Sequence, residues 1–498
     1  MYKLKRIIKL INIILITAII CLCCGCSGSS SKAYIYFELP EKPQTLDPQT
    51  ASLNSELLIA RNIFEGLLRK DSGGKIVCGA AESYEKNGLT YSFKIREDAV
   101  WSNGEDVTAD DFVFGIGRAV DPATESPFAY RLFCIKNAEK INSGFADINS
   151  LGIKAVDEKT VEIELEYEDT DFEESLTSPV AMPCNRDFFE SAVGKYGLTR
   201  EYIISNGSYR LTKWNKEEFG IRIYKNEEYN GNFKAKNAAV FLTCNTEEES
   251  VLSMLKNNKI DAAFLKGNEI TEASDSGFKT VLYENICWFL TISDEIPLEM
   301  RKSFSMLINP EIFKENEIYS IADSIYPSDI ISENDIITEG INSYSFSEGK
   351  ALFESGLSHL ENNKFPSSTT LKYENSGDVK TVLTALAGHW QKHLGAYINI
   401  EAQDNTDELI SQLNEQSLPF SFFPVTAKGG SAEEYVRYFS ESFSADNLAL
   451  VQQTILKDYN IIPVMFEKTA IGYNEYLTEI YTDSGNGYID FSFVIKNE

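Results

Sequence analysis

Basic residues are scarce in this chain. Its 498 residues include 46 Lys and Arg against 75 Asp and Glu, a formal net charge of −29. Such an excess of acid argues against a nucleic-acid partner and against direct adhesion of the whole chain to anionic lipid. Solubility alone explains the acidity, so it does not indicate that a ligand is cationic.

Histidine is rarer still, with three residues, and no complete catalytic or phosphate-binding motif is present. Neither G-x-x-x-x-G-K-[ST] nor G-x-S-x-G occurs. His389 and His393 have the i, i+4 spacing of two metal ligands on one helix face. Trp390 and Gln391 follow His389, so the glutamate of an HExxH site is missing. We therefore predict no metal, no cofactor and no enzymatic activity.

Long apolar runs are absent except near the start. The run from Leu10 to Leu22 is broken only by Asn12 and Thr17 and follows a basic, acid-free segment. A membrane span needs about 20 apolar residues, so this length is more typical of a signal peptide, predicted over residues 1–25. An uncleaved membrane anchor is the alternative. No other run is long enough to span a bilayer, and the rest of the chain is expected outside the membrane.

Three cysteines follow the end of this run, in "LCCGC", residues 22–26. Gly25-Cys26 resembles the lipobox of bacterial lipoproteins, in which such a cysteine is acylated, although Cys23 stands where that family prefers leucine. The resemblance implies that Cys26 is lipidated and that residues 26–33, rich in Ser and Gly, form a flexible tether. A zinc site is disfavoured because no second Cys/His pair follows at a suitable spacing. The chain would then lie on the outer face of the cytoplasmic membrane, extracellular or periplasmic.

Few cysteines remain beyond the tether, and their number is odd. A short secreted domain held by disulfides is therefore excluded, and we expect most of these thiols to be buried as small apolar groups. They are Cys78, Cys134, Cys184, Cys244 and Cys287.

Residue patterns predict strands and helices interleaved over two or three domains, an α+β fold. Residues 34–39 read as a strand and residues 55–68 as a helix. Asn87-Gly88 is a hairpin signal, and Thr108 is a plausible cap for a helix that ends before Pro122. After about residue 290 we expect helices and loops to dominate, with strands again near the end, at residues 460–473 and 487–495.

Several stretches together resemble the family 5 extracellular solute-binding proteins of ABC importers, which include oligopeptide, dipeptide and nickel receptors. The closest match is "YSFKIREDAVWSNGEDVTADDFVFGIGRAVDP", and "TLDPQ", "NIFEGLLRKDSGGKIVCGAAESYE", "SNGSYRLTKW", "NNKIDAAFL" and "IPLEMRKSFSMLIN" continue it in order. The resemblance runs from about residue 34 to residue 400 and weakens beyond. It implies a periplasmic-binding-protein-like receptor of two lobes that close about a hinge.

The resemblance also implies three domains, the first of them discontinuous. The predicted division is lobe 1 main domain, 34–68, 191–277 and 476–498; lobe 1 accessory domain, 69–190; and lobe 2, 278–475.

Oligopeptide receptors of this family pair an aspartate with the amino terminus of the peptide. An ungapped match places Lys428 at that aspartate, Val425 at the tryptophan that precedes it and Phe422 at an arginine used for some peptide carboxylates. A lysine would repel an ammonium group. Either the alignment is shifted, and Glu433 or Glu434 supplies the anion, or the ligand is not a peptide with a free amino terminus.

Further ligand-binding candidates follow from family positions that line the slot. They are Ser52 and Asn54 after "LDP", Phe128 in "SPFAYRL", and Trp288 with Phe289 in an aromatic strand. If Trp288, Phe289, Phe422 and Phe423 shared the slot, it would be more apolar than a clamp for peptide termini. Each aromatic residue has a plain alternative as a core residue.

The leading functional hypothesis is a membrane-tethered receptor that captures a peptide or other small solute for the permease of an ABC importer and works as a monomer. The alternative is a diverged surface lipoprotein that senses a signal or binds another protein. A surface hydrolase is the third reading, for which the abundant acids single out no catalytic pair.

Overall fold

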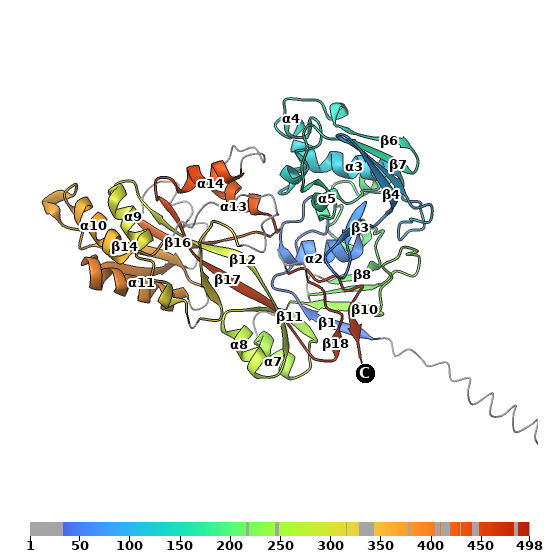
Figure 1. The fold of residues 1–498 in the computed structure, drawn as a ribbon. Helices are drawn as coiled ribbons and strands as arrows, with labels where there is room; N and C mark the ends of the chain where they lie inside the picture. Colours follow the sequence, from blue (N-terminus) through green and yellow to red (C-terminus); the bar gives the residue numbers. More distant parts are fainter. Residues whose placement is uncertain are drawn as a thin grey trace, which may run out of the picture.

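A computed structural model of the chain has two lobes side by side, lobe 1 on the right of Figure 1 and lobe 2 on the left. The structure describes residues 33–215, 219–244, 249–314, 316–327, 343–376, 379–403, 409, 419–428, 430–440, 448–482 and 487–497. The predicted signal peptide and Cys26 lie outside these residues. Within them, no helix combines the length and the apolar character needed to cross a bilayer. The mixture of sheets and helices confirms the α+β class predicted from the sequence.

The main sheet has eleven strands and runs through both lobes, in the order β15-β14-β16-β12-β17-β11-β1-β10-β9-β8, with β13 paired to β17. The lobe 1 part contains β1 (Tyr34–Glu38), β8 (Tyr209–Asn215), β9 (Gly220–Lys225), β10 (Ala239–Thr243) and β11 (Ala262–Lys266). The lobe 2 part contains β13 (Tyr319–Ile321), β14 (Thr369–Glu374), β15 (Ile398–Gln403) and β16 (Phe420–Thr426).

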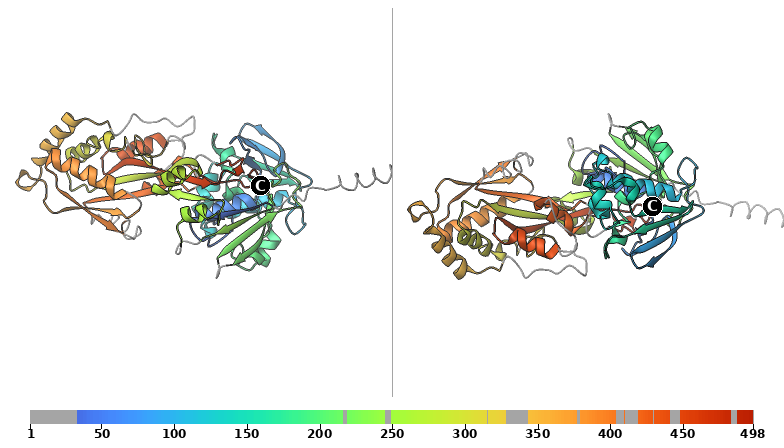
Figure 2. Two further views of the ribbon diagram at one scale, coloured as in Figure 1. Left: turned by 90° about the horizontal axis from the view of Figure 1, so that it is seen from below. Right: turned by 90° about the horizontal axis from the view of Figure 1, so that it is seen from above.

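Two long strands join the lobes. β12 (Lys279–Ile292) and β17 (Ile461–Tyr473) pair antiparallel over most of their length. The end of β17 also pairs with β11 of lobe 1, whereas the other half of β12 pairs with β16 of lobe 2. Figure 2 shows these strands passing between the two lobes in both views. This pair of strands is a covalent and hydrogen-bonded link between the lobes, and a rotation of one lobe against the other would have to bend it.

Alternation along the lobe 1 strands creates its core. Ile35 and Phe37 on β1 are fully buried, as are Ile223 on β9 and Val240 on β10, while the residues between them face the other side. The helix α2 (Asn54–Ile63) packs into the same cluster. The sequence pattern predicted this helix to reach residue 68, but it ends at Ile63, and β2 (Leu68–Lys70) follows, paired with β3 (Ile76–Cys78).

A separate antiparallel sheet of lobe 1 has the order β4-β5-β7-β6. Gly88 takes a φ of +61° at the predicted hairpin between β4 and β5. The predicted cap is also present, since the Thr108 amide donates to the Asp111 carboxylate, 2.8 Å away, at the start of α3. The hydrophobic core of this sheet is continuous with that of the main sheet in lobe 1. Its strands are β4 (Ala81–Asn87), β5 (Thr90–Ile95), β6 (Ile153–Asp157) and β7 (Thr160–Glu164).

The helices are distributed over both lobes. Those of lobe 1 are α3 (Ala109–Val120), α4 (Ala138–Asn142), α5 (Phe172–Ser175), α6 (Arg186–Ser191), α7 (Val251–Lys256) and α8 (Asn268–Asp275), with the short 3₁₀ helix η2 (Ala129–Leu132). Those of lobe 2 are α9 (Leu298–Met306), α10 (Phe346–Leu357), α11 (Val379–Leu394), α13 (Ala432–Phe439) and α14 (Leu448–Leu456).

The last third of the chain differs from the prediction made from its sequence. Strands β14, β15 and β16 lie in a region expected to be mostly helix and loop. Conversely, residues 487–495 were expected to form a strand, but only the two-residue β19 (Ile495–Lys496), paired with β18 (Leu477–Thr478), is present there. The aromatic side chains of this segment, among them Tyr488 and Phe491, are buried against lobe 1 without strand pairing.

The five later cysteines are all free thiols, four of them buried and Cys78 half-buried. This confirms the expectation that most of them are small core residues. The closest pair of histidines is His389 and His393 on α11, whose ring centroids lie 4.5 Å apart. Among the described residues, no group of three or more His, Cys, Asp or Glu side chains is arranged to hold a metal ion.

Candidate functional site

The start of α2 is fixed by one buried carboxylate. Glu56 accepts hydrogen bonds from the backbone amides of Gln44 and Thr45 and, through its other oxygen, from those of Ser52 and Leu53. The backbone of the predicted ligand residue Ser52 is therefore held in one conformation. The second predicted residue here, Asn54, has a side-chain oxygen that is buried without a hydrogen-bond partner. A buried acceptor of this kind costs free energy unless something donates to it.

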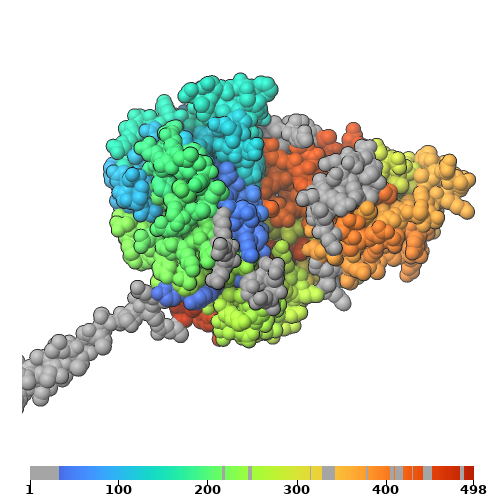
Figure 3. Space-filling view, turned by 180° about the vertical axis from the view of Figure 1, so that it is seen from behind, coloured from blue at the N-terminus to red at the C-terminus, as the bar shows by residue number. Residues whose placement is uncertain are grey.

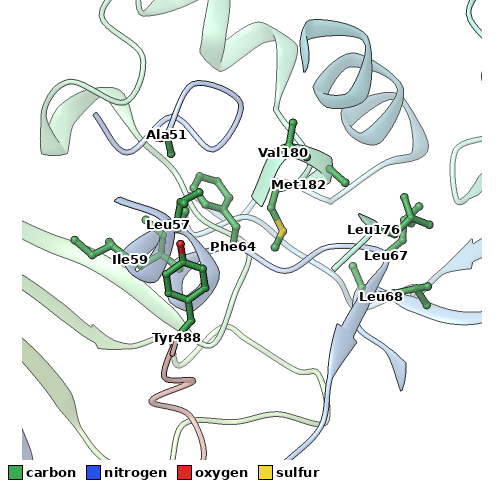
Figure 4. Packing of buried hydrophobic residues seen from close by; sticks show 14 of the residues in the cluster. Ala51, Leu57, Ile59, Phe64, Leu67, Leu68, Leu176, Val180, Met182 and Tyr488 are labelled. Carbon is green, nitrogen blue, oxygen red and sulfur yellow. The ribbon is translucent and has the colours of Figure 1, made fainter. Parts of the chain in front are cut away.

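The other end of α2 borders a pocket of lobe 1, an open hollow whose volume of ≈ 520 Å³ includes open solvent at its mouth. Its lining combines apolar and charged side chains from α2, the segment that follows it, and the C-terminal segment. They are Arg61, Phe64, Glu65, Gly66, Arg69, Lys70, Thr177, Met182, Tyr481, Tyr488, Ile489 and Asp490. Figure 4 shows Phe64, Met182 and Tyr488 converging from three separate segments.

The charges in this pocket largely neutralise one another. Glu65 accepts from Arg69 at 3.2 Å and from Arg96 at 2.8 Å, and the Tyr229 hydroxyl also donates to it. Arg69 pairs in addition with Asp490. Burial would lower the pKa of Arg69, but these carboxylates more than offset it, so that its pKa lies above the ordinary arginine value. Arg69 and Glu65 therefore hold four chain segments together as a buried network.

Tyr488 connects this pocket to lobe 2. Its hydroxyl donates a hydrogen bond to the backbone carbonyl of Lys428, which follows β16. The Arg61 guanidinium lies 5.0 Å from the centroid of the Tyr488 ring. The predicted ligand residue Lys428 is thus held at the junction of the lobes, beside the pocket.

A second contact between the lobes is made by α13. The Arg437 guanidinium lies 4.6 Å from the ring centroid of Tyr130 and 5.6 Å from that of Phe133, both in lobe 1. Arg437 also forms an ion pair with Glu433 at 2.6 Å. Cation–aromatic contacts of this kind stabilise by about 0.5–2 kcal/mol, depending on how far they exclude water.

Glu433 is nearly buried in this contact. Burial raises the pKa of its carboxyl to about 6, although Arg437 and Arg131 act to lower it. Close by, the Tyr130 hydroxyl is buried without a hydrogen-bond partner, and Phe128 is 7% exposed at the start of the same turn. The structure therefore brings two predicted residues, Glu433 and Phe128, to the same side of the lobe junction.

The four aromatic residues considered as a possible shared lining of the slot, Trp288, Phe289, Phe422 and Phe423, do not lie on one surface. Trp288 stacks on Phe422 with centroids 5.3 Å apart, in one core cluster of lobe 2, and its indole N–H donates to Glu467 at 2.7 Å. Phe289 and Phe423 belong to a different cluster, in which Phe289 meets Phe439 of α13 edge-on. Successive residues of a strand point to opposite faces of its sheet, which separates 288 from 289 and 422 from 423. All four side chains are at most 1% exposed.

Several residues at the junction escaped the reading of the sequence: Arg61, Tyr130, Arg437 and Tyr488. Arg437 stands four residues after Glu433, a spacing that signals an ion pair on a helix but not a contact with the other lobe. Tyr488 and Arg61 are 427 positions apart in the chain, so no local pattern could connect them.

A family model described as "Bacterial extracellular solute-binding proteins, family 5 Middle" matches residues 75–447. The oligopeptide-binding protein OppA of Bacillus subtilis is 25% identical over 386 residues, covering 74% of this chain and 71% of its own. The dipeptide-binding protein DppE of the same species is 24% identical over 508 residues, covering 94% and 93%. Among solved structures, OppA of Listeria monocytogenes bound to peptide superimposes with a TM-score of 0.74 at 19% identity, covering 94% of this chain and all of that one. This likeness shows that the fold is that of a two-lobed periplasmic binding protein, as the sequence predicted.

Proposed function

Because the chain belongs to the family 5 bacterial extracellular solute-binding proteins, we propose that it captures a peptide or peptide-like small solute between its lobes and delivers it to the permease of an ABC importer. The similar proteins are named as binding proteins, not as enzymes. The single observation that carries the proposal for this chain is the junction itself. Tyr488 with Lys428, and Arg437 with Tyr130, connect the two lobes.

Two buried polar atoms of lobe 1 are suited to a ligand. Asn54 offers an acceptor and Tyr130 offers a hydroxyl, and neither is satisfied within the chain. Groups that lose water without gaining a partner are costly in the unliganded protein. A solute enclosed between the lobes would gain affinity by satisfying them, and the gain exists only in the closed form.

The ligand class follows from Lys428. We propose that its ammonium replaces the aspartate by which oligopeptide receptors of this family hold a free amino terminus. A cation at this position disfavours a peptide ammonium and favours a neutral or anionic group at that end. The preferred ligands would then be peptides with a blocked amino terminus, or related amides. The other residues that we propose to lie near the ligand are Ser52, Asn54, Phe128 and Glu433. Trp288, Phe289 and Phe422 would contribute indirectly, as part of the core of lobe 2 that supports the binding surface.

The remaining parts of the proposal concern position and organisation. Cys26 would carry the lipid that tethers a monomer to the outer face of the cytoplasmic membrane. The proposed domains are those predicted from the sequence, and the separate β4–β7 sheet supports an accessory unit within lobe 1.

Ligand-dependent stabilisation tests the receptor and its ligand class together. A ligand present at 100 times its Kd stabilises the protein by about 2.7 kcal/mol, which is readily seen in thermal unfolding. We expect N-acetylated tri- to pentapeptides to stabilise the chain more than the same peptides with free amino termini. Lys428→Asp should reverse this order, with Lys392→Asp on the exposed side of α11 as the matched control.

Stabilisation by no peptide of either kind would refute the peptide ligand. It would favour the alternative of a diverged sensor or interaction protein, which the departure at Lys428 also supports. Stabilisation by both kinds with no effect of Lys428→Asp would refute only the role of Lys428.

A further inference from the structure

The face of the lobe 1 sheet opposite its core is unusually aromatic. Tyr34 stacks on Phe241 with centroids 5.1 Å apart, and Tyr36 meets the same ring edge-on at 5.1 Å. Tyr224 lies 6.0 Å from Phe241 and 6.4 Å from Tyr34. These four rings on β1, β9 and β10 form one contiguous surface, here called the outer aromatic face. None is fully buried, and Tyr36 is 39% exposed.

Basic side chains surround this face. Arg222 lies over the Phe241 ring at 4.9 Å, and in the strand register Arg210 stands opposite Tyr224 and Lys213 opposite Arg222. Arg210, Lys213 and Arg222 are all exposed, and none of them forms an ion pair with another described residue.

A fourth cation, Lys496, closes one edge of the outer aromatic face. It lies 5.5 Å from the centroid of the Tyr36 ring and forms an ion pair with Asp261 at 2.7 Å. The face is therefore locally basic, although the chain as a whole carries a net charge of −29.

The position of the first described residues places the outer aromatic face close, along the chain, to Cys26. Ala33 directly precedes Tyr34, so the chain enters lobe 1 at the edge of the outer aromatic face. Figure 1 shows β1 and the C-terminus at this same end of lobe 1, and Figure 3 shows the blue N-terminal residues beside the red C-terminal ones at the molecular surface. Only six residues lie between Cys26 and Ala33. Even when fully extended they span at most about 25 Å.

We propose that the outer aromatic face rests against the headgroup layer of the membrane that holds the lipid at Cys26. The inference rests on the proposed lipid anchor and is independent of the solute. Tyrosine rings and the aliphatic stems of Arg and Lys are favoured where apolar and aqueous regions meet, and the guanidinium and ammonium groups attract anionic headgroups. The short tether keeps this face close to the lipid, so even a weak attraction would orient the receptor. The net negative charge of the chain opposes adhesion of surfaces that lack such a basic cluster.

Photochemical cross-linking tests the proposal with the whole acylated chain, purified from bacterial membranes and placed in vesicles of phosphatidylglycerol and phosphatidylcholine. The photoreactive residue p-benzoylphenylalanine replaces Tyr36, or Tyr397 of lobe 2 as the matched position, which is 53% exposed. After irradiation, lipid adducts are counted by mass spectrometry. We expect position 36 to give at least about fivefold more lipid adduct than position 397, the ratio that one basic residue near the surface would produce.

The double charge reversal Arg210→Glu with Arg222→Glu should reduce the adduct at position 36 by about tenfold or more, since each basic residue near an anionic surface contributes severalfold to the attraction. The same reversal at Lys380 and Lys392 on the exposed side of α11 should leave it unchanged.

The possible results distinguish a failure of the proposed lipid anchor from a failure of the proposed membrane-facing surface. A chain that does not partition with membranes would overturn the lipid anchor and, with it, this proposal. An anchored chain that cross-links lipid equally at positions 36 and 397, or that is insensitive to the Arg210 and Arg222 reversals, would overturn the membrane-facing surface and leave the receptor function intact.

Discussion

Replacing Glu433 by glutamine tests the contact between the lobes. The carboxyl is nearly buried beside Arg437, whose guanidinium packs on Tyr130 of lobe 1. Burial raises its pKa to about 6 from an ordinary value of 4.5. Glutamine has almost the same shape and can still accept a hydrogen bond from Arg437, but it has no charge at any pH.

The sign and size of the effect follow from linkage. Because the pKa of Glu433 is higher in the folded protein than in the unfolded chain, the ionised carboxylate destabilises the folded state. This penalty is fully present above pH 6 and disappears as the pH falls below 4.5. A difference of about 1.5 pKa units corresponds to about 2 kcal/mol. Relative to the glutamine variant, the wild type should therefore gain about 2 kcal/mol in its free energy of unfolding between pH 7.5 and pH 3.5.

The assay is urea unfolding of the wild type and of Glu433→Gln across this pH range. The difference between the two proteins isolates Glu433, because every other titrating group is common to both. Glu348→Gln, an exposed residue in the first turn of α10, is the matched control and should show no such trend. Arg437→Ala provides a second check: it removes a group that lowers the pKa of Glu433, so the pH dependence should move to higher pH.

A difference between wild type and Glu433→Gln that does not change with pH would refute the reasoning. It would mean that Glu433 is hydrated in solution and that α13 is not held against lobe 1. A pH trend of the predicted sign that is unaffected by Arg437→Ala would mean that Arg437 does not lower the pKa of Glu433 in solution.

Three further predictions concern backbone, core and anchor. Gly197→Ala should destabilise the protein by about 2–4 kcal/mol in thermal unfolding, because Gly197 has a φ of +74° and the added Cβ would lie 2.4 Å from a backbone nitrogen. Gly144→Ala is the control: Gly144 has a φ of +76° but no atom within 4 Å of the added Cβ, so this substitution should cost only about 1 kcal/mol. Trp288→Phe should lower the free energy of unfolding by about 2–3 kcal/mol, since it leaves the buried Glu467 carboxyl without its indole donor. This destabilisation should be smaller at a pH low enough to protonate the Glu467 carboxyl. An equal destabilisation at all pH values would assign the effect to packing instead. Cys26→Ala should abolish labelling of the chain by radioactive fatty acid, and labelling that persists would refute the lipid anchor.

Local patterns in the sequence determined much of the fold. Thr108 and Asp111 cap α3 through contacts three residues apart, and Gly88 provides the backbone conformation that its hairpin needs. Such features depend on neighbours in the chain and can be read without the tertiary structure. The order and spacing of many short motifs identified the family, which in turn gave the two lobes.

Strand β14 in lobe 2 keeps an alternation of buried and half-buried residues. Strand β16 was missed because it lies in the interior of the main sheet, between β14 and β12, where its first four residues are all buried and period-two alternation fades. The stretch "FSFFPV" of β16 gives no sign of the side on which each ring will lie. Only the sheet decided that Trp288 and Phe422 support one core cluster while Phe289 and Phe423 support another.

The sequence by itself determined the family, the α+β class, the cap of α3 and the β4–β5 hairpin of lobe 1, because each follows from residues close together in the chain. The tertiary structure alone decided the junction of the lobes. Arg437 meets Tyr130 across some 300 residues of chain, and Tyr488 reaches Arg61 and Lys428 from a C-terminal segment without regular structure. Contacts between such distant residues are set by how whole elements pack, and no local propensity specifies them.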